Sequence, residues 1–194
     1  MKIKSTLTLA VLLGGLGCMA SANAADPVTG FYMGGSLGMA STNVSFNNIN
    51  SNMTVTDKTD RALSIRTGYR IHTNWAVEGG YADLGTMKYK ETGWPDGSMK
   101  TSVWHIDAVG IIPLADKIEV FGKVGVAQMN YTFNDGYKDH KTTPHLGLGI
   151  SYAILPALAL RAEYDDYGKA KYSDGSSSVD INSSQFSLGM DYRF

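Results

Sequence analysis

The sequence predicts an all-β protein, an eight-stranded antiparallel up-and-down transmembrane β-barrel. Three observations lead to this prediction: apolar and polar residues alternate in eight segments, the connections between segments alternate between long and short, and the polar positions are mostly small residues with a few charges. Successive side chains of a strand point to opposite faces, so each segment forms a strand with one apolar and one polar face. In barrels of the bacterial outer membrane the apolar face contacts lipid and the polar face lines the lumen.

The first 24 residues have the composition of a secretory signal peptide. Lys2 and Lys4 precede an apolar stretch of about ten residues, and residues 22–24 read Ala-Asn-Ala, a typical cleavage site. The apolar stretch is too short to cross a bilayer as a helix, which requires about 20 residues. We therefore expect a signal peptide over residues 1–24 and a single barrel domain over residues 25–194.

Composition restricts the compartment and the partners. Cys18 is the single cysteine, and it lies within the predicted signal peptide. Export without disulfides is typical of the bacterial envelope rather than of small secreted scaffolds. Cys18 raises a lipoprotein as an alternative, but Gly15 stands where such signals usually have leucine. The formal net charge of −1 at pH 7 argues against nucleic acid as a partner.

The eight predicted strands share an apolar face of aliphatic and aromatic residues. The first four, with their apolar residues, are 30–40 (Phe31, Met33, Leu37, Met39), 61–71 (Leu63, Ile65, Tyr69, Ile71), 75–83 (Trp75, Val77, Tyr81) and 100–112 (Trp104, Ile106, Ala108, Ile112). The last four are 118–129 (Ile118, Val120, Val124, Val126), 142–154 (Leu146, Leu148, Ile150, Tyr152), 157–165 (Leu158, Leu160, Ala162, Tyr164) and 184–194 (Phe186, Leu188, Met190, Tyr192, Phe194). Each is close to the length of about 9 to 11 residues that a tilted strand needs to cross a bilayer.

The connections predict which rim faces which side of the membrane. Polar stretches over residues 41–60, 85–99, 131–141 and 166–182 predict four long loops, and three short turns separate the other strands. Outer-membrane barrels have long extracellular loops and short periplasmic turns. An even number of strands also places both termini on the periplasmic side.

A soluble barrel such as a lipocalin is the alternative, with the apolar face turned inward. Eight strands enclose a lumen just wide enough for side chains to fill. More than about twenty large apolar side chains would overfill that lumen, whereas small residues with scattered ion pairs fit. The membrane barrel is therefore favoured.

Several motifs resemble the transmembrane domain of outer membrane protein A, over nearly all of residues 25–194. The most specific are Val-Glu-Gly-Gly-Tyr at residues 77–81, Tyr-Ala-Ile-Leu-Pro at 152–156, Leu-Arg-Ala-Glu-Tyr at 160–164 and Ser-Leu-Gly-Met-Asp-Tyr-Arg-Phe at 187–194. In that family a periplasmic peptidoglycan-binding domain usually follows the barrel. This sequence ends at Phe194, so we expect no cell-wall anchoring.

The resemblance implies two functional features. The family has lumenal ion pairs proposed to gate a narrow water path, and Glu78, Lys123, Arg161 and Glu163 match that cluster. Ser151 stands where the family has a carboxylate and Val109 where it has a lysine, so the family's exchange of partners does not carry over in full. The resemblance also implies that the terminal aromatic strand, with Tyr192 and Phe194, is read by the outer-membrane assembly machinery.

The polar face itself supplies a candidate lumenal site. Glu78, Lys123, Arg161 and Glu163 lie on this face together with Asp107 and His105. Charges confined in a lumen require partners. They form either a plug that fills and stiffens the barrel or a gated path for ions or small solutes. Asp191 and Arg193 are also expected to face the lumen, close to the periplasmic rim.

The predicted loops supply a second candidate site. Basic residues gather in the third and fourth long loops: Lys138, His140, Lys141, Lys169 and Lys171. One interpretation is a solvated surface beside lipopolysaccharide phosphates, which attract cations. The other is recognition of a host or phage ligand.

Neither catalysis nor a cofactor is expected. His145 and Ser151 share a face but lie roughly 20 Å apart along a strand, too far for a nucleophile and its base. No G-x-S-x-G motif is present, and the four histidines show no metal-ligand spacing along the sequence. The sequence predicts an integral outer-membrane barrel with a structural role in the envelope and loops available for interaction. A narrow, low-conductance pore is the alternative.

Overall fold

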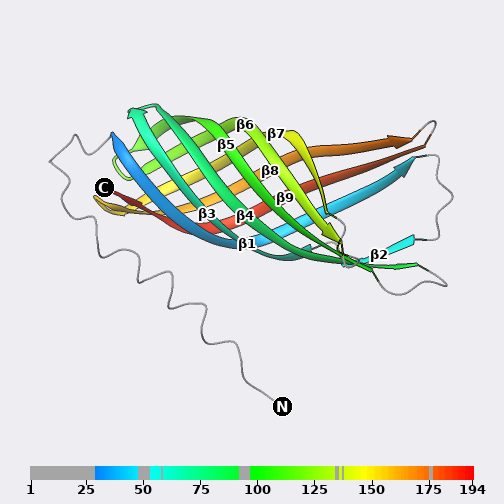
Figure 1. Ribbon diagram of the computed structural model, residues 1–194. Helices are drawn as coiled ribbons and strands as arrows, with labels where there is room; N and C mark the ends of the chain where they lie inside the picture. Colours follow the sequence, from blue (N-terminus) through cyan, green and yellow to red (C-terminus); the bar gives the residue numbers. More distant parts are fainter. Residues whose placement is uncertain are drawn as a thin grey trace, which may run out of the picture.

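The computed structural model is a closed antiparallel β-barrel (Figure 1). It describes residues 29–47, 53–57, 59–91, 97–133, 136, 138–174 and 177–194, so the predicted signal peptide lies outside the described residues. The strands are β1 (Gly30–Asn47), β2 (Met53–Asp57), β3 (Thr59–His72), β4 (Trp75–Glu91), β5 (Gly97–Ala115), β6 (Ile118–Phe133), β7 (Lys138–Leu155), β8 (Leu158–Asp174) and β9 (Ser177–Arg193). The described residues contain no helix long and apolar enough to cross a membrane.

Eight of these strands form the barrel, which confirms the predicted fold class. Each pairs antiparallel with its neighbours along the chain, β1 pairs with both β3 and β9, and the β4–β5 pairing completes the ring. Within the described part of the chain, the short β2 strand pairs with β4 alone, at residues 88–91, beyond the region where β3 and β4 pair. At the seam, the backbone N–H of Phe194 donates to the carbonyl oxygen of Phe31 at 3.0 Å.

The two faces of the wall have the predicted orientation. The large apolar side chains point outward and are exposed, for example Leu37 at 66% and Leu148 at 68%. The intervening residues point into the lumen and include Glu78, which is fully buried. This arrangement excludes the soluble barrel, because there the apolar face would be the buried one.

The two ends of the barrel differ as predicted, but the strands are longer than predicted. Two-residue turns at 73–74, 116–117 and 156–157 join strands at one end, where the C-terminus also lies (Figure 1). At the opposite rim much of what was predicted to be loop is strand: β1 continues to Asn47, and β8 and β9 are separated only by residues 175–176. Outward positions there are polar, such as Asn43 and Ser184. The change to polar composition therefore marks the end of the apolar outer surface of the barrel, whereas the backbone pairing of the strands continues beyond it.

Two Asp-x-Gly bulges interrupt the register near this rim. In β4, Asp83 accepts the N–H of Gly85 at 3.0 Å, and in β8, Asp166 accepts the N–H of Gly168 at 2.8 Å. The glycines have φ of +82° and +70°, a region that favours glycine, and the register shifts at both sites. Each bulge directs its middle residue, Leu84 or Tyr167, into the lumen.

The lumen is more apolar than predicted. One apolar cluster lies toward the long-loop rim, the end of the barrel opposite the two-residue turns, and includes Met99, Val103, Met129, Tyr131 and Tyr167. A smaller apolar cluster lies near the two-residue turns and contains Tyr32, Ala76, Val109, Ile111 and Phe121. Charged side chains lie between them, so the prediction of small residues with scattered charges holds only for the middle of the lumen. The sequence analysis did not predict these clusters. It treated the whole inward face of each strand as polar, so the large apolar residues at some inward positions were not considered.

Candidate functional site

The candidate site is a belt of charged side chains across the middle of the lumen. Its members project from seven of the eight barrel strands and are each at most 9% exposed at the side chain. We call this set the lumenal belt: Arg66, Glu78, His105, Asp107, Lys123, His145, Arg161, Glu163, Asp165 and Asp191. It contains all six residues that the sequence predicted for the lumenal cluster.

Two cations and two carboxylates form the centre of the belt. Arg161 contacts Glu78 at 2.8 Å and Glu163 at 2.8 Å. Lys123 contacts Glu78 at 3.3 Å and also pairs with Glu163. Each cation therefore contacts both carboxylates, which places the four residues matched by resemblance in one network.

The environment of this centre fixes its side chains. The hydroxyl of Tyr32 donates to Glu78 at 2.8 Å, and the Arg161 guanidinium lies 4.0 Å from the centroid of the Phe121 ring. A hydrogen bond and a cation–π contact therefore connect the centre to the smaller apolar cluster. Buried ion pairs are stable only when the remaining donors and acceptors also find partners.

Four residues extend the belt beyond the predicted cluster, namely His145 and the three charged residues Arg66, Asp165 and Asp191. Arg66 donates to Asp191 at 2.7 Å, and Asp191 also contacts Arg161 at 3.2 Å, which confirms that Asp191 faces the lumen. Asp165 contacts Lys123 at 3.0 Å. All three occupy the polar face of their strands, so alternation could have nominated them, but alternation says nothing about which strands bring them together.

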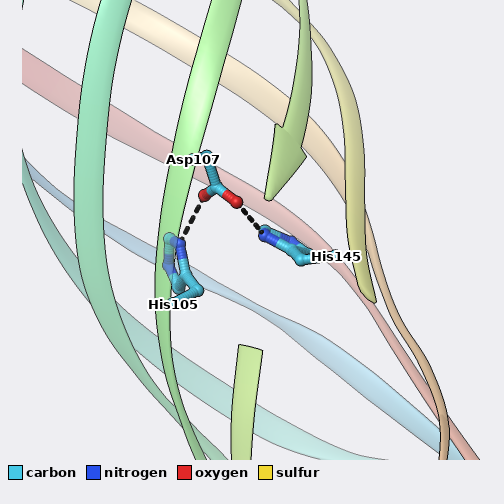
Figure 2. Close-up of side chains that lie close together, drawn as sticks. All are labelled: His105, Asp107 and His145. Carbon is cyan, nitrogen blue, oxygen red and sulfur yellow. Dashed lines mark hydrogen bonds and ion pairs between the residues drawn. The ribbon is translucent and has the colours of Figure 1, made fainter. Parts of the chain in front are cut away.

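His145 is the belt member that sequence reasoning placed on the polar face without a role. Figure 2 shows Asp107 between two imidazole rings: its carboxylate contacts His105 Nδ1 at 2.6 Å and His145 Nδ1 at 2.7 Å. Asp107 and His145 lie in one row with Gly125 between them, because Asp107 pairs with Gly125 and Gly125 pairs with His145. A Cβ at Gly125 would lie 2.2 Å from Asp107 Oδ1, so the glycine leaves room for the carboxylate.

A separate ion-pair network lies near the two-residue turns. Glu119 accepts from Arg70 at 2.9 Å and from Arg193 at 2.9 Å. The side chains of Glu119 and Arg193 are 20% and 27% exposed, so solvent reaches this network more easily than the belt. Arg193 thus lies at the end of the lumen where the sequence predicted it.

The basic residues predicted for the loops lie on strands. Lys138 and His140 are exposed on β7 and Lys169 is exposed on β8, whereas Lys141 is half-buried. The side chain of Lys171 lies outside the described part. The β7–β8 pairing ends at Leu146 and Asp166, so beyond this point β7 pairs with β6 and β8 with β9.

The two aromatic residues of the predicted assembly signal lie together at the seam. Tyr192 and Phe194 are 38% and 40% exposed, and their rings pack edge to face with centroids 5.0 Å apart. Both point outward, as the alternation predicted.

An eight-stranded barrel with an apolar exterior and a charged lumen defines an outer-membrane β-barrel protein. The family model for the outer membrane protein beta-barrel domain matches residues 8–194, so the chain belongs to this family. It is 29% identical to outer membrane protein P5 of Haemophilus influenzae over 209 residues and 28% identical to outer membrane protein A of Escherichia coli O157:H7 over 199 residues. These alignments cover 96% and 98% of the chain but 59% and 55% of the relatives, so the chain spans little more than half their length.

Solved structures show the same fold. Neisserial surface protein A superposes with a TM-score of 0.58 at 18% identity, covering 84% of this chain and 97% of that one. OprG of Pseudomonas aeruginosa gives a TM-score of 0.61 at 15% identity, with 86% and 97% covered. Ail of Yersinia pestis, solved in complex with the heparin analogue sucrose octasulfate, gives 0.50 at 20% identity, with 85% and 99% covered. The chain is a β-barrel of the bacterial outer membrane, in contact with its lipids.

Proposed function

We propose that this barrel has a structural role in envelope integrity and presents its long-loop rim for surface interactions. The filled lumen is the observation that carries the structural role. Two apolar clusters lie on either side of a belt of paired charges, and the cavity beside Arg66 and His105 has a volume of about 10 Å³, room for about one water molecule. A lumen packed in this way stiffens the wall, and the described side chains narrow any water path through it.

Loss of the protein in its native host tests the structural role. A deletion strain should become more sensitive to detergent and to large antibiotics that an intact outer membrane excludes. Expression of the wild-type chain should restore resistance. A deletion strain with unchanged resistance would contradict the proposal.

A narrow gated pore is the second candidate. It is supported by the contacts of Lys123 and Arg161, each of which pairs with both Glu78 and Glu163. Shared carboxylates allow a change of partners without leaving a charge unpaired. Lys123→Ala should then raise single-channel conductance in planar bilayers, and Lys138→Ala at the exposed rim should leave it unchanged. An unaltered trace for Lys123→Ala would count against a gate.

The exposed cations of the rim support binding of an anionic ligand. Lys138 and Lys169 point away from the lumen on β7 and β8, where lipopolysaccharide phosphates or a polyanion on a host cell or phage are accessible. Ail, a barrel of the same fold, was solved with a polysulfated heparin analogue. Replacing the rim segments by those of another barrel should abolish binding to immobilised heparin. Binding that survives the replacement would exclude this role of the rim.

The terminal aromatic pair, Tyr192 and Phe194, is proposed as the signal for the outer-membrane assembly machinery. Its outward position at the seam between β9 and β1 supports this role, because a recognition signal must be accessible before the ring closes.

We also infer that the chain is not an enzyme. The buried imidazoles of His105 and His145 contact carboxylates, and a nucleophilic serine needs an imidazole within about 3 Å.

A further inference from the structure

Asp107 differs from the other carboxylates of the lumenal belt in its partners. It is 2% exposed, and among the described residues its ion-pair partners are two histidines rather than lysine or arginine. Glu78, Glu163, Asp165 and Asp191 each contact at least one lysine or arginine. A buried carboxylate needs a positive partner. Among the described residues, the two imidazoles can serve as that partner when they are protonated, or they can help to bind a cation beside the carboxylate.

The net charge of the lumenal belt also indicates that Asp107 needs a positive partner. Its permanent cations are Arg66, Lys123 and Arg161, and its carboxylates are Glu78, Asp107, Glu163, Asp165 and Asp191. With neutral histidines the belt therefore has two negative charges in excess. Uncompensated charge is costly among buried side chains, and Asp107 is the belt carboxylate without a lysine or arginine contact among the described residues, so the missing positive charge is expected beside it. Either two imidazolium ions or one divalent cation would supply it.

The donor atoms of this group converge as metal ligands do. One ligand atom each from His105, Asp107 and His145 can be chosen so that all lie within 4.8 Å of one another. Donors of one tetrahedral zinc ion lie about 3.3 Å apart, since Zn–N and Zn–O distances are about 2.0–2.1 Å. Small side-chain rotations would open the present contacts of 2.6 and 2.7 Å to that spacing.

Asp165 sets the orientation of one of these ligands. His145 Nε2 lies 3.1 Å from Asp165 Oδ1, a distance at which a protonated Nε2 donates to Asp165, and this tautomer leaves the lone pair of Nδ1 available to a metal ion. Carboxylates commonly fix the tautomer of metal-ligating histidines in this way. The Tyr167 ring stacks on His145 at 4.8 Å and 14°, which restricts rotation of the imidazole.

We propose that His105, Asp107 and His145 bind a divalent transition-metal ion inside the barrel, with Zn²⁺ the best match. Two imidazole nitrogens and one carboxylate oxygen suit zinc and its neighbours, whereas Ca²⁺ and Mg²⁺ prefer oxygen ligands alone. A small cavity with room for about one water molecule lies next to one of the three ligands, His105, and is also bordered by Arg66, Lys123, Asp165 and Tyr167. A divalent ion at this position neutralises the belt without protonation of either histidine.

Metal binding by the refolded chain tests the proposal. The protein is refolded into detergent with Zn²⁺ or with a chelator, its fold is checked by heat modifiability on a gel, and bound zinc is measured by mass spectrometry after dialysis. We expect one zinc per chain, with at least a tenfold weaker affinity in His105→Asn and in His145→Asn. His140→Asn, which changes an exposed histidine at the rim, should bind zinc as the wild type does.

The outcomes are distinguishable. If His145→Asn fails to fold, His105→Asn and Asp165→Asn still test the site, and the latter should weaken binding about 10- to 100-fold without abolishing it. A wild-type chain that binds no zinc, with both imidazoles protonated at neutral pH by NMR, would overturn the proposal in favour of an imidazolium pair. Equal loss of zinc in His140→Asn would also overturn it.

Discussion

At the scale of single residues, Arg161 has three charged partners in the belt, as many as Lys123. Its guanidinium contacts Glu78, Glu163 and Asp191 and stacks over Phe121. Arginine suits this position because its planar group donates in several directions at once. Removing it leaves three buried carboxylates with fewer positive partners.

Arg161→Gln is therefore expected to destabilise the barrel strongly. Breaking a buried ion pair from one side typically costs about 3–5 kcal/mol, because the remaining charge stays buried. Arg193→Gln is the matched control, since Arg193 pairs with Glu119 at a partly exposed end of the lumen and should cost about 1 kcal/mol or less. Urea unfolding in lipid vesicles measures both variants. A loss of about 1 kcal/mol or less in Arg161→Gln, as expected for the control, would show that the belt does not stabilise the fold.

The residue scale also shows what alternation can and cannot predict. A period of two assigned Glu78 and Arg161 correctly to the lumen, because side-chain direction depends only on position along one strand. The meeting of Asp107 with His145 depends on the register of β5, β6 and β7 and on the absence of a side chain at Gly125. Neither register nor lateral packing is encoded in the periodicity, so the His-Asp-His group was missed.

At the scale of elements, the Asp-x-Gly bulges explain why the predicted strands ended too early. Composition becomes polar near Gly85 and Asp166, and glycine together with aspartate normally signals a turn. Here the aspartate accepts the glycine N–H within the strand, and pairing resumes at Thr86 and at Lys169. The same residue pair can build a turn or a bulge, and only the partner strand decides between them.

Gly168 allows the energetic role of one bulge to be measured. An alanine there would adopt a φ of +70° and place its Cβ 2.6 Å from the carbonyl oxygen of Pro144, so Gly168→Ala should cost about 2–4 kcal/mol. At Gly136 the φ of +86° is similar, but no atom of the described residues lies within 4 Å of an added Cβ, and Gly136→Ala should cost about 1 kcal/mol. The difference in unfolding free energy isolates the close packing of β7 against the bulge. Equal costs would mean that backbone conformation alone requires the glycine.

At the scale of the whole molecule, a barrel has no free sheet edge only when its first and last strands pair. β1 pairs with β9 from Tyr32 with Arg193 to Asn47 with Ser178, and the N–H of Phe194 adds one bond at the end of the seam. This bond is a small part of a long ladder. The thermodynamic stability of the closed barrel should therefore depend little on the last residue, whereas recognition of the last strand before closure should depend on it strongly.

Deletion of Phe194 separates these two roles. The truncated chain should accumulate several-fold less in the outer membrane of growing cells, because we propose that the assembly machinery reads the terminal aromatic. After refolding into lipid vesicles, the same chain should unfold within about 1 kcal/mol of the wild type, since one backbone hydrogen bond contributes about that much. Phe194→Tyr keeps both the ring and the backbone bond, and it should behave as the wild type in both measurements. Normal outer-membrane levels of the truncated chain would refute the role of Phe194 in assembly, and a large loss of stability would assign it to closure of the barrel.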